Sequence, residues 1–73
     1  MEARSRFTKV FDERVNSLIA DGYCKRVDAR LSYVWVARFQ HVSNGNKIVL
    51  KGYPINGKIY QWTNGKNVHC ETV

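Results

Sequence analysis

The sequence predicts an α+β domain in which one N-terminal helix packs on one face of an antiparallel β-meander of four strands, with a candidate fifth strand at its edge. Three Asn-Gly pairs lie between runs that alternate apolar and polar residues, at Asn44-Gly45, Asn56-Gly57 and Asn64-Gly65. Asn-Gly is the strongest short-range signal for a hairpin, because both central residues of a type I′ turn need positive φ. The second observation is an apolar stripe with helical spacing before residue 22. A chain of 73 residues is the size of one domain, so residues 1–73 are expected to fold as a single unit.

The helix is expected over about residues 4–21. Apolar side chains recur there at steps of three and four, which places them on one stripe of a helix: Phe7, Val10, Phe11, Val15, Leu18 and Ile19. Ser5 is the candidate N-cap, and Gly22 suits the position after the last turn because it accepts the left-handed conformation. The stripe is expected to cover the sheet, which is the only other element that could bury it.

The hairpin signals predict four strands, at about residues 31–42, 47–53, 58–63 and 66–71. The stretch before them is ambiguous. Residues 23–27 alternate in character, which favours a short edge strand that turns back near Asp28-Ala29. The same stretch also fits a basic loop, because no Gly or Pro marks the turn.

Two-residue turns fix the register of the strands, and residues directly opposite one another share a face. In this register Phe39 lies opposite Leu50, and Lys58 lies opposite Glu71. The face expected to form the core comprises Tyr33, Trp35, Ala37, Phe39, Ile48, Leu50, Ile59, Val68 and Cys70. Gly52 is expected beside Ala37, where a helix could approach closely. A single-residue bulge at Gly52-Pro54 would exchange the two faces.

The opposite face of the expected sheet mixes aromatic rings with cations, and no second helix is left in the chain to cover it. Its candidate binding residues are Arg38, Lys47, Lys51, Tyr53, Lys58, Tyr60 and Trp62. The other side chains expected on this face are Val34, Val36, Gln40, Val49, Asn67 and His69. Rings that stack on bases, beside cations that meet phosphates, are the combination used by sheet-based proteins that bind single-stranded nucleic acid.

The charge of the chain is unevenly distributed. Lys and Arg number 12 against 6 Asp and Glu, which gives a formal net charge of +6. The cations and acids of residues 1–22 sum to zero, so the whole excess lies on the strand-forming part. A basic surface of this kind favours a polyanionic partner, and it also keeps a protein soluble.

Four interpretations of the basic aromatic face are open. The rings can support neighbouring strands by cross-strand packing, with lysines that discourage edge-to-edge aggregation. The same rings, together with Val34, Val36 and Val49, can form a homodimer or protein-interaction surface. Binding of single-stranded nucleic acid is the leading specific function, and catalysis is the fourth interpretation.

Catalysis and metal binding have little support in the sequence. The two histidines, His41 and His69, are expected on opposite faces of the sheet, where they cannot share a proton relay or a metal. The chain has no nucleophile–base signature and no Gly-rich phosphate loop, and too few ligands gather for a metal site. We therefore expect a non-enzymatic module without a metal or a cofactor.

The cysteines and the first residues bear on the compartment. Cys24 and Cys70 are too few for a disulfide scaffold, and both are expected as free thiols that are buried like small hydrophobic residues. No apolar run follows the opening Met-Glu-Ala-Arg-Ser-Arg, so neither a signal peptide nor a membrane span is expected. Together these observations predict a cytoplasmic protein.

Overall fold

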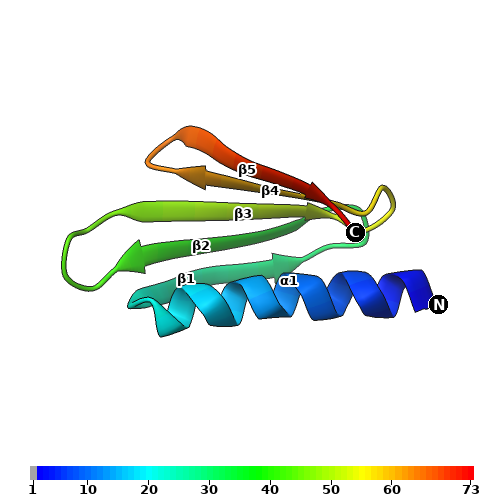
Figure 1. Ribbon diagram of the computed structural model, residues 1–73, viewed down its shortest axis with the longest axis horizontal. Coiled ribbons are helices and arrows are strands. Elements are labelled where there is room, and N and C mark those ends of the chain that lie inside the picture. Colours follow the sequence, from blue (N-terminus) through cyan, green and yellow to red (C-terminus); the bar gives the residue numbers. More distant parts are fainter. Residues whose placement is uncertain (1) are drawn as a thin grey trace.

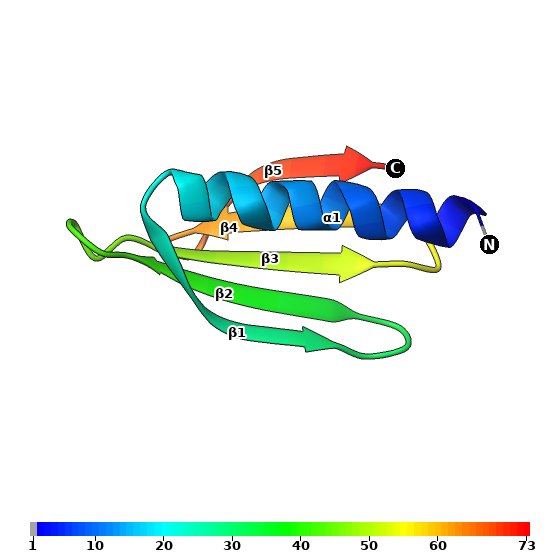
Figure 2. The same ribbon diagram turned by 90° about the horizontal axis from the view of Figure 1, so that it is seen from below.

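The structure is a computed structural model that describes residues 2–73. Its elements are α1 (Glu2–Ala20), β1 (Tyr23–Arg30), β2 (Trp35–His41), β3 (Lys47–Tyr53), β4 (Lys58–Thr63) and β5 (Lys66–Thr72). The strands form one antiparallel sheet in the order β1-β2-β3-β4-β5, which is a meander. The helix runs alongside the strands on one side of the sheet, and none of the described elements lies against the other side (Figure 1, Figure 2). The predicted fold class is confirmed. The candidate edge strand is present as β1, but it continues to Arg30, so the turn expected near Asp28-Ala29 is wrong.

The helix begins earlier than the sequence suggested. Because α1 starts at Glu2, Ser5 lies inside the helix and is not its N-cap. At the other end Gly22 has φ of +97° and terminates the helix as expected. The ring of His41 closes this end, since its Nε2 lies 3.0 Å from the carbonyl oxygen of Asp21.

The core lies between α1 and the facing side of the sheet. Its buried residues are Phe7, Phe11, Val15, Leu18, Trp35, Ala37, Phe39, Ile48, Leu50 and Ile59. The rings of Phe7 and Phe11 both meet Trp35 edge-on, with centroid distances of 5.0 and 5.3 Å. Gly52 is buried beneath these two phenylalanines, so the expected close approach of the helix is present. Ile19, at the end of the apolar stripe, is 46% exposed.

Three residues predicted for the core are exposed instead. Tyr33 lies in the turn between β1 and β2, where the N–H of Leu31 donates to the carbonyl of Val34, so the strand expected from residue 31 begins only at Trp35. Val68 and Cys70 belong to the edge strand β5 and are also exposed. Cys24 on the opposite edge strand is exposed as well, so the expected burial of both cysteines is wrong, although both are free thiols.

Of the three hairpins that contain an Asn-Gly pair, the first two have longer loops than the expected two-residue turns, with five residues between β2 and β3 and four between β3 and β4. Only the glycine of each pair has positive φ, at Gly45 and Gly57. Phe39 therefore lies opposite Ile48, two residues along β3 from the expected Leu50. A register shift of two residues leaves the faces unchanged because side chains alternate with period two. The third hairpin has positive φ at both Asn64 and Gly65, as a type I′ turn requires.

Each edge strand contains one bulge. In β1, Arg26 is the extra residue between the pairs that Lys25 and Val27 make with β2, and in β5 the extra residue is Val68. A one-residue insertion exchanges the faces of everything beyond it. The expected pairing of Lys58 with Glu71 is therefore wrong, since Glu71 lies opposite Ile59 and faces the helix. The bulge considered at Gly52-Pro54 does not occur, because β3 pairs without interruption as far as Tyr53.

Candidate binding face

The side of the sheet away from α1, which we call the open face, carries every candidate binding residue of the sequence analysis. Arg38 comes from β2, the residues Lys47, Lys51 and Tyr53 from β3, and Lys58, Tyr60 and Trp62 from β4. The cross-strand pairs fix this placement: Arg38 lies opposite Val49, which lies opposite Trp62. Lys51 lies opposite Tyr60 in the next row of the same face. His69, which was also expected here, lies on the helix side because of the β5 bulge.

Three aromatic rings form a ladder on the open face. Tyr53 and Tyr60 meet edge-on with ring centroids 5.8 Å apart, and Tyr60 and Trp62 are also 5.8 Å apart with 38° between their planes. All three side chains are half-buried, so each ring is held in place while part of its surface is open to solvent. Lys51 places its Nζ 5.6 Å from the centroid of Trp62, within the range of a cation–π interaction.

Two hollows meet at the Trp62 ring. The larger, of about 550 Å³, is lined by Arg38, Lys47, Val49, Lys51, Trp62, Asn64 and Gly65. The smaller, of about 350 Å³, is lined by Tyr53, Asn56, Lys58, Tyr60 and Trp62. The first is basic and the second is aromatic, and together they contain all seven candidate residues. Asn56 and Asn64 also line these hollows, although the Asn-Gly pairs mark them only as turn residues.

A third hollow, of about 350 Å³, extends the open face toward β1. Its cations are Arg26, Arg38 and Lys47. Arg26 was not among the candidates, because residues 23–27 fit a basic loop as well as an edge strand in the sequence. With Arg26 included, the open face carries five cations: Arg26, Arg38, Lys47, Lys51 and Lys58.

Among the side chains that the structure describes, no carboxylate lies on the open face. Only two acids occur in the strands, Asp28 and Glu71, and each follows a bulge that turns it to the helix side. Without those bulges, the alternation of the strand would place both carboxylates among the cations. The bulges therefore keep both carboxylates of the sheet away from the open face.

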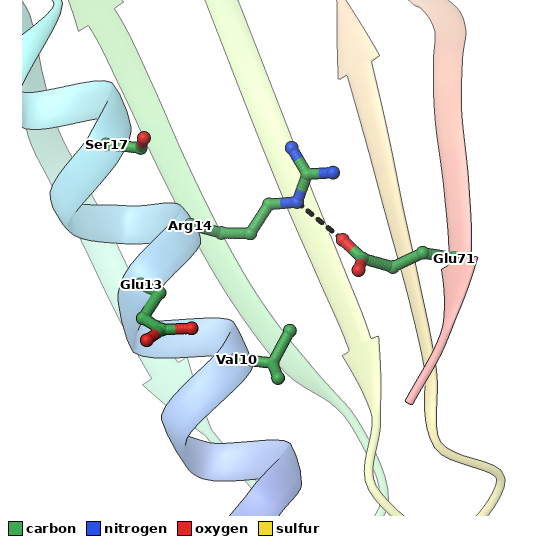
Figure 3. Close-up of a pocket in the computed structure, with 5 residues that line it drawn as sticks. All are labelled: Val10, Glu13, Arg14, Ser17 and Glu71. Carbon is green, nitrogen blue, oxygen red and sulfur yellow. Dashed lines mark hydrogen bonds and ion pairs between the residues drawn. The ribbon is translucent and has the colours of Figure 1, made fainter.

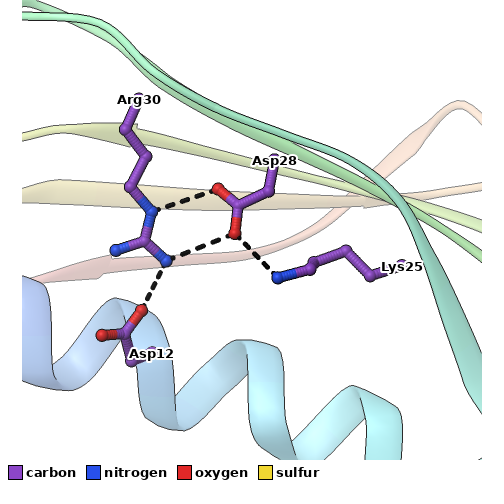
Figure 4. Close-up of polar contacts among 4 residues, drawn as sticks. All are labelled: Asp12, Lys25, Asp28 and Arg30. Carbon is purple, nitrogen blue, oxygen red and sulfur yellow. Dashed lines mark hydrogen bonds and ion pairs between the residues drawn. The ribbon is translucent and has the colours of Figure 1, made fainter.

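Asp28 is held on the helix side by two cations of its own strand. Its carboxylate accepts hydrogen bonds from Lys25 Nζ at 3.0 Å and from Arg30 Nε at 3.1 Å (Figure 4). Arg30 also bonds Asp12 of α1 and lies over the ring of Trp35, 4.8 Å from its centroid. Partial burial would raise the pKa of Asp28, but the hydrogen bonds from Arg30 and Lys25 outweigh it and lower the pKa.

Glu71 is held in a similar way at the other edge of the sheet. Arg14 reaches from α1 to β5, where its Nε donates to Glu71 Oε1 at 2.6 Å (Figure 3). His69 Nε2 lies 3.3 Å from the same oxygen, and the guanidinium of Arg14 also contacts the imidazole. Arg14 and Glu71, which pair with each other, line the small hollow between α1 and β5 together with Val10, Glu13 and Ser17.

The two histidines both lie on the helix side, contrary to the expectation that they occupy opposite faces. They are nevertheless apart, because His41 is in β2 and His69 is in β5, with two strands between them. Within residues 2–73, no group of three or more His, Cys, Asp or Glu is arranged to hold a metal ion. No helix in this part of the chain is long and apolar enough to cross a membrane.

No protein-family model matches the chain, and neither a curated protein nor a solved structure matches it. The function must therefore be argued from the open face itself.

Proposed function

We propose that the protein is a small non-enzymatic module that binds single-stranded nucleic acid through the open face. One observation carries the proposal: five cations and a ladder of three aromatic rings share a face on which no described carboxylate lies. Cations attract the phosphates of a nucleic acid, and the release of counterions supplies much of the affinity. Aromatic rings add base stacking, which tolerates any sequence because every base has a π-face.

The rings favour a single strand over a duplex. In a duplex the bases are stacked on each other, so a protein meets phosphates, sugars and groove edges. The Tyr60 and Trp62 rings could stack only on bases that are unpaired and splayed out. Cations alone would bind the phosphates of a single strand or of a duplex. The aromatic ladder is the feature that favours the single strand.

Self-association through the same face is the alternative, and the charge of the face argues against it. Val36, Val49 and the rings offer apolar area of the kind found in protein interfaces. A second copy docked face to face would, however, bring the five cations of each copy together with no described carboxylate to neutralise them. Like charges placed in contact cost several kcal/mol in typical interfaces. A polyanion matches the face better.

The free cysteines bear on where the protein works. Cys24 and Cys70 are exposed and form no disulfide. Exposed thiols persist in a reducing compartment, and on that ground we propose a cytoplasmic location.

Fluorescence anisotropy with a labelled octathymidylate tests the proposal. The wild type should bind at low salt, and Trp62→Ala should weaken binding by about 1–3 kcal/mol, which is the value of one stacked base. Lys51→Ala should weaken binding of every sequence alike and reduce the salt slope by about 0.7, the contribution of one phosphate contact in a single strand. Lys9→Ala, on the exposed side of α1, removes the same charge elsewhere and should change neither quantity.

Two results would contradict the proposal. The first is an absence of binding to any RNA or DNA oligomer by the folded wild type at low salt. The second is a dimer in sedimentation that Trp62→Ala converts to a monomer, because the open face would then be an interface between copies.

A further inference from the structure

The hollow next to β1 differs in composition from the aromatic end of the open face. Arg26, Arg38 and Lys47 come from three adjacent strands and line it together, over a floor that includes Val27 and Val49. None of the three cations forms an ion pair with a described carboxylate. The aromatic ladder, by contrast, lies on β3 and β4.

The β1 bulge keeps the acid of its own strand away from this group of cations. Lys25 pairs with Phe39 and Val27 with Arg38, so Arg26 is the additional residue between these pairs. The insertion keeps Arg26 and Val27 together at the hollow and sends Asp28 to the helix side. One irregularity therefore leaves the cation at the hollow and removes the nearest acid of the strand.

We infer that this hollow is the phosphate site of the open face: a bound single strand of nucleic acid crosses the sheet, with the phosphates of one end in this hollow and the bases of the other end on the aromatic ladder of β3 and β4. The inference rests on the proposed function. Three unpaired cations around one concavity provide the charge and the hydrogen-bond donors that a phosphate requires. The β5 side of the ladder contributes Asn67, Cys70 and Thr72 to the same face and no cation, so the bases and not the phosphates meet that side.

The hollows also give the path of the bound nucleic acid. The β1-side hollow shares Arg38 and Lys47 with the central hollow, which shares Trp62 with the aromatic one. The nucleic acid therefore crosses the sheet from β1 to β4. Neighbouring strands lie about 4.8 Å apart, so these three steps span roughly 14 Å. We expect a footprint of about four nucleotides, at the small end of the range for sheet-based single-strand binders.

Salt titration of octathymidylate binding separates the two ends of the path. Each phosphate contact in a single strand contributes about 0.7 to the slope of log K against log salt, so Arg26→Gln should lower the slope by about that amount. Lys9→Gln makes the same change of charge on the exposed side of α1 and should leave the slope unchanged. Trp62→Ala should weaken binding several-fold without changing the slope, because a ring neutralises no phosphate. The thermal midpoint of each variant checks that it is folded.

A second probe, tripolyphosphate, contains phosphates without bases. In an amide NMR titration it should shift the signals of Arg26, Arg38 and Lys47 and leave those of Tyr60 and Trp62 in place, whereas octathymidylate should shift both groups. If octathymidylate binds but Arg26→Gln keeps the full slope and tripolyphosphate shifts none of the three, the phosphate site is refuted while the proposed function stands. If octathymidylate does not bind at all, the proposed function fails, and the orientation of the strand fails with it.

Discussion

Replacing Gly52 with alanine tests where the helix touches the sheet. A methyl group at Gly52 would come within 2.9 Å of Phe7 Cζ and 3.0 Å of Phe11 Cδ2. These rings are 1% and 0% exposed, so neither can swing into solvent to make room. The backbone at Gly52 does not have positive φ and accepts alanine without strain. The cost of the change is therefore purely steric.

The size of the effect follows from two opposing terms. Overpacking a closed core costs typically about 1–3 kcal/mol. Replacing glycine lowers the entropy of the unfolded chain, which returns about 0.4–1 kcal/mol. We expect a net loss of about 1–2 kcal/mol, and each kcal/mol should lower the thermal midpoint by about 4–8 °C in a domain of this size.

Urea denaturation measures the loss directly. Gly52→Ala should lower the midpoint concentration without changing the slope m, because the surface exposed on unfolding is the same. Phe7→Leu removes the ring atom that the methyl group would strike, so Gly52→Ala should cost less in that background than in the wild type. A Gly52→Ala protein as stable as the wild type would refute the packing of α1 against β3.

Two further predictions concern a turn and an ion pair. Gly57→Ala should cost more stability than Gly45→Ala in thermal unfolding: both residues have positive φ, but only at Gly57 would the methyl group meet another atom, the carbonyl oxygen of Val73 at 2.9 Å. Equal costs would mean that Val73 does not dock on this loop. Because the pKa of Asp28 is lowered from 3.8, its stabilising effect is complete above that pH and is lost as the pH falls through the folded-state pKa. Asp28→Asn should therefore flatten the loss of unfolding free energy below pH 3.8, and parallel curves for wild type and Asp28→Asn would contradict the ion pairs.

The central strands could be predicted from the sequence because their boundaries are marked chemically. Lys47–Tyr53 and Lys58–Thr63 end at residues that favour turns, and both bounds are correct. The loops turned out longer than Asn-Gly alone implies, but the resulting shift was even and preserved the faces. For this reason all seven candidate residues lie on the open face, since all of them come from β2, β3 and β4.

The errors in the sheet faces come from the edge strands, where the sequence offers no corresponding signal. A bulge needs only one additional residue, and neither Arg26 nor Val68 differs in type from an ordinary strand residue. After each bulge the alternation of side chains resumes with the two faces exchanged. The sequence before the bulge and the sequence after it therefore each resemble a regular strand. His69 and Cys70 were misplaced for this reason, whereas Arg26 was overlooked because residues 23–27 also fit a loop.

The bulges at Arg26 and Val68 also change what small genetic events can do to this protein. A substitution alters one side chain, whereas loss of one codon after a bulge moves every later residue of that strand to the other side of the sheet. Loss of the codon for Val68 would only remove the bulge and leave Glu71 opposite Ile59, but loss of the codon for Cys70 would place Glu71 opposite Tyr60 on the open face and remove its ion pair with Arg14. The charge along each edge of the open face therefore depends on the number of residues in β1 and β5 as well as on their types.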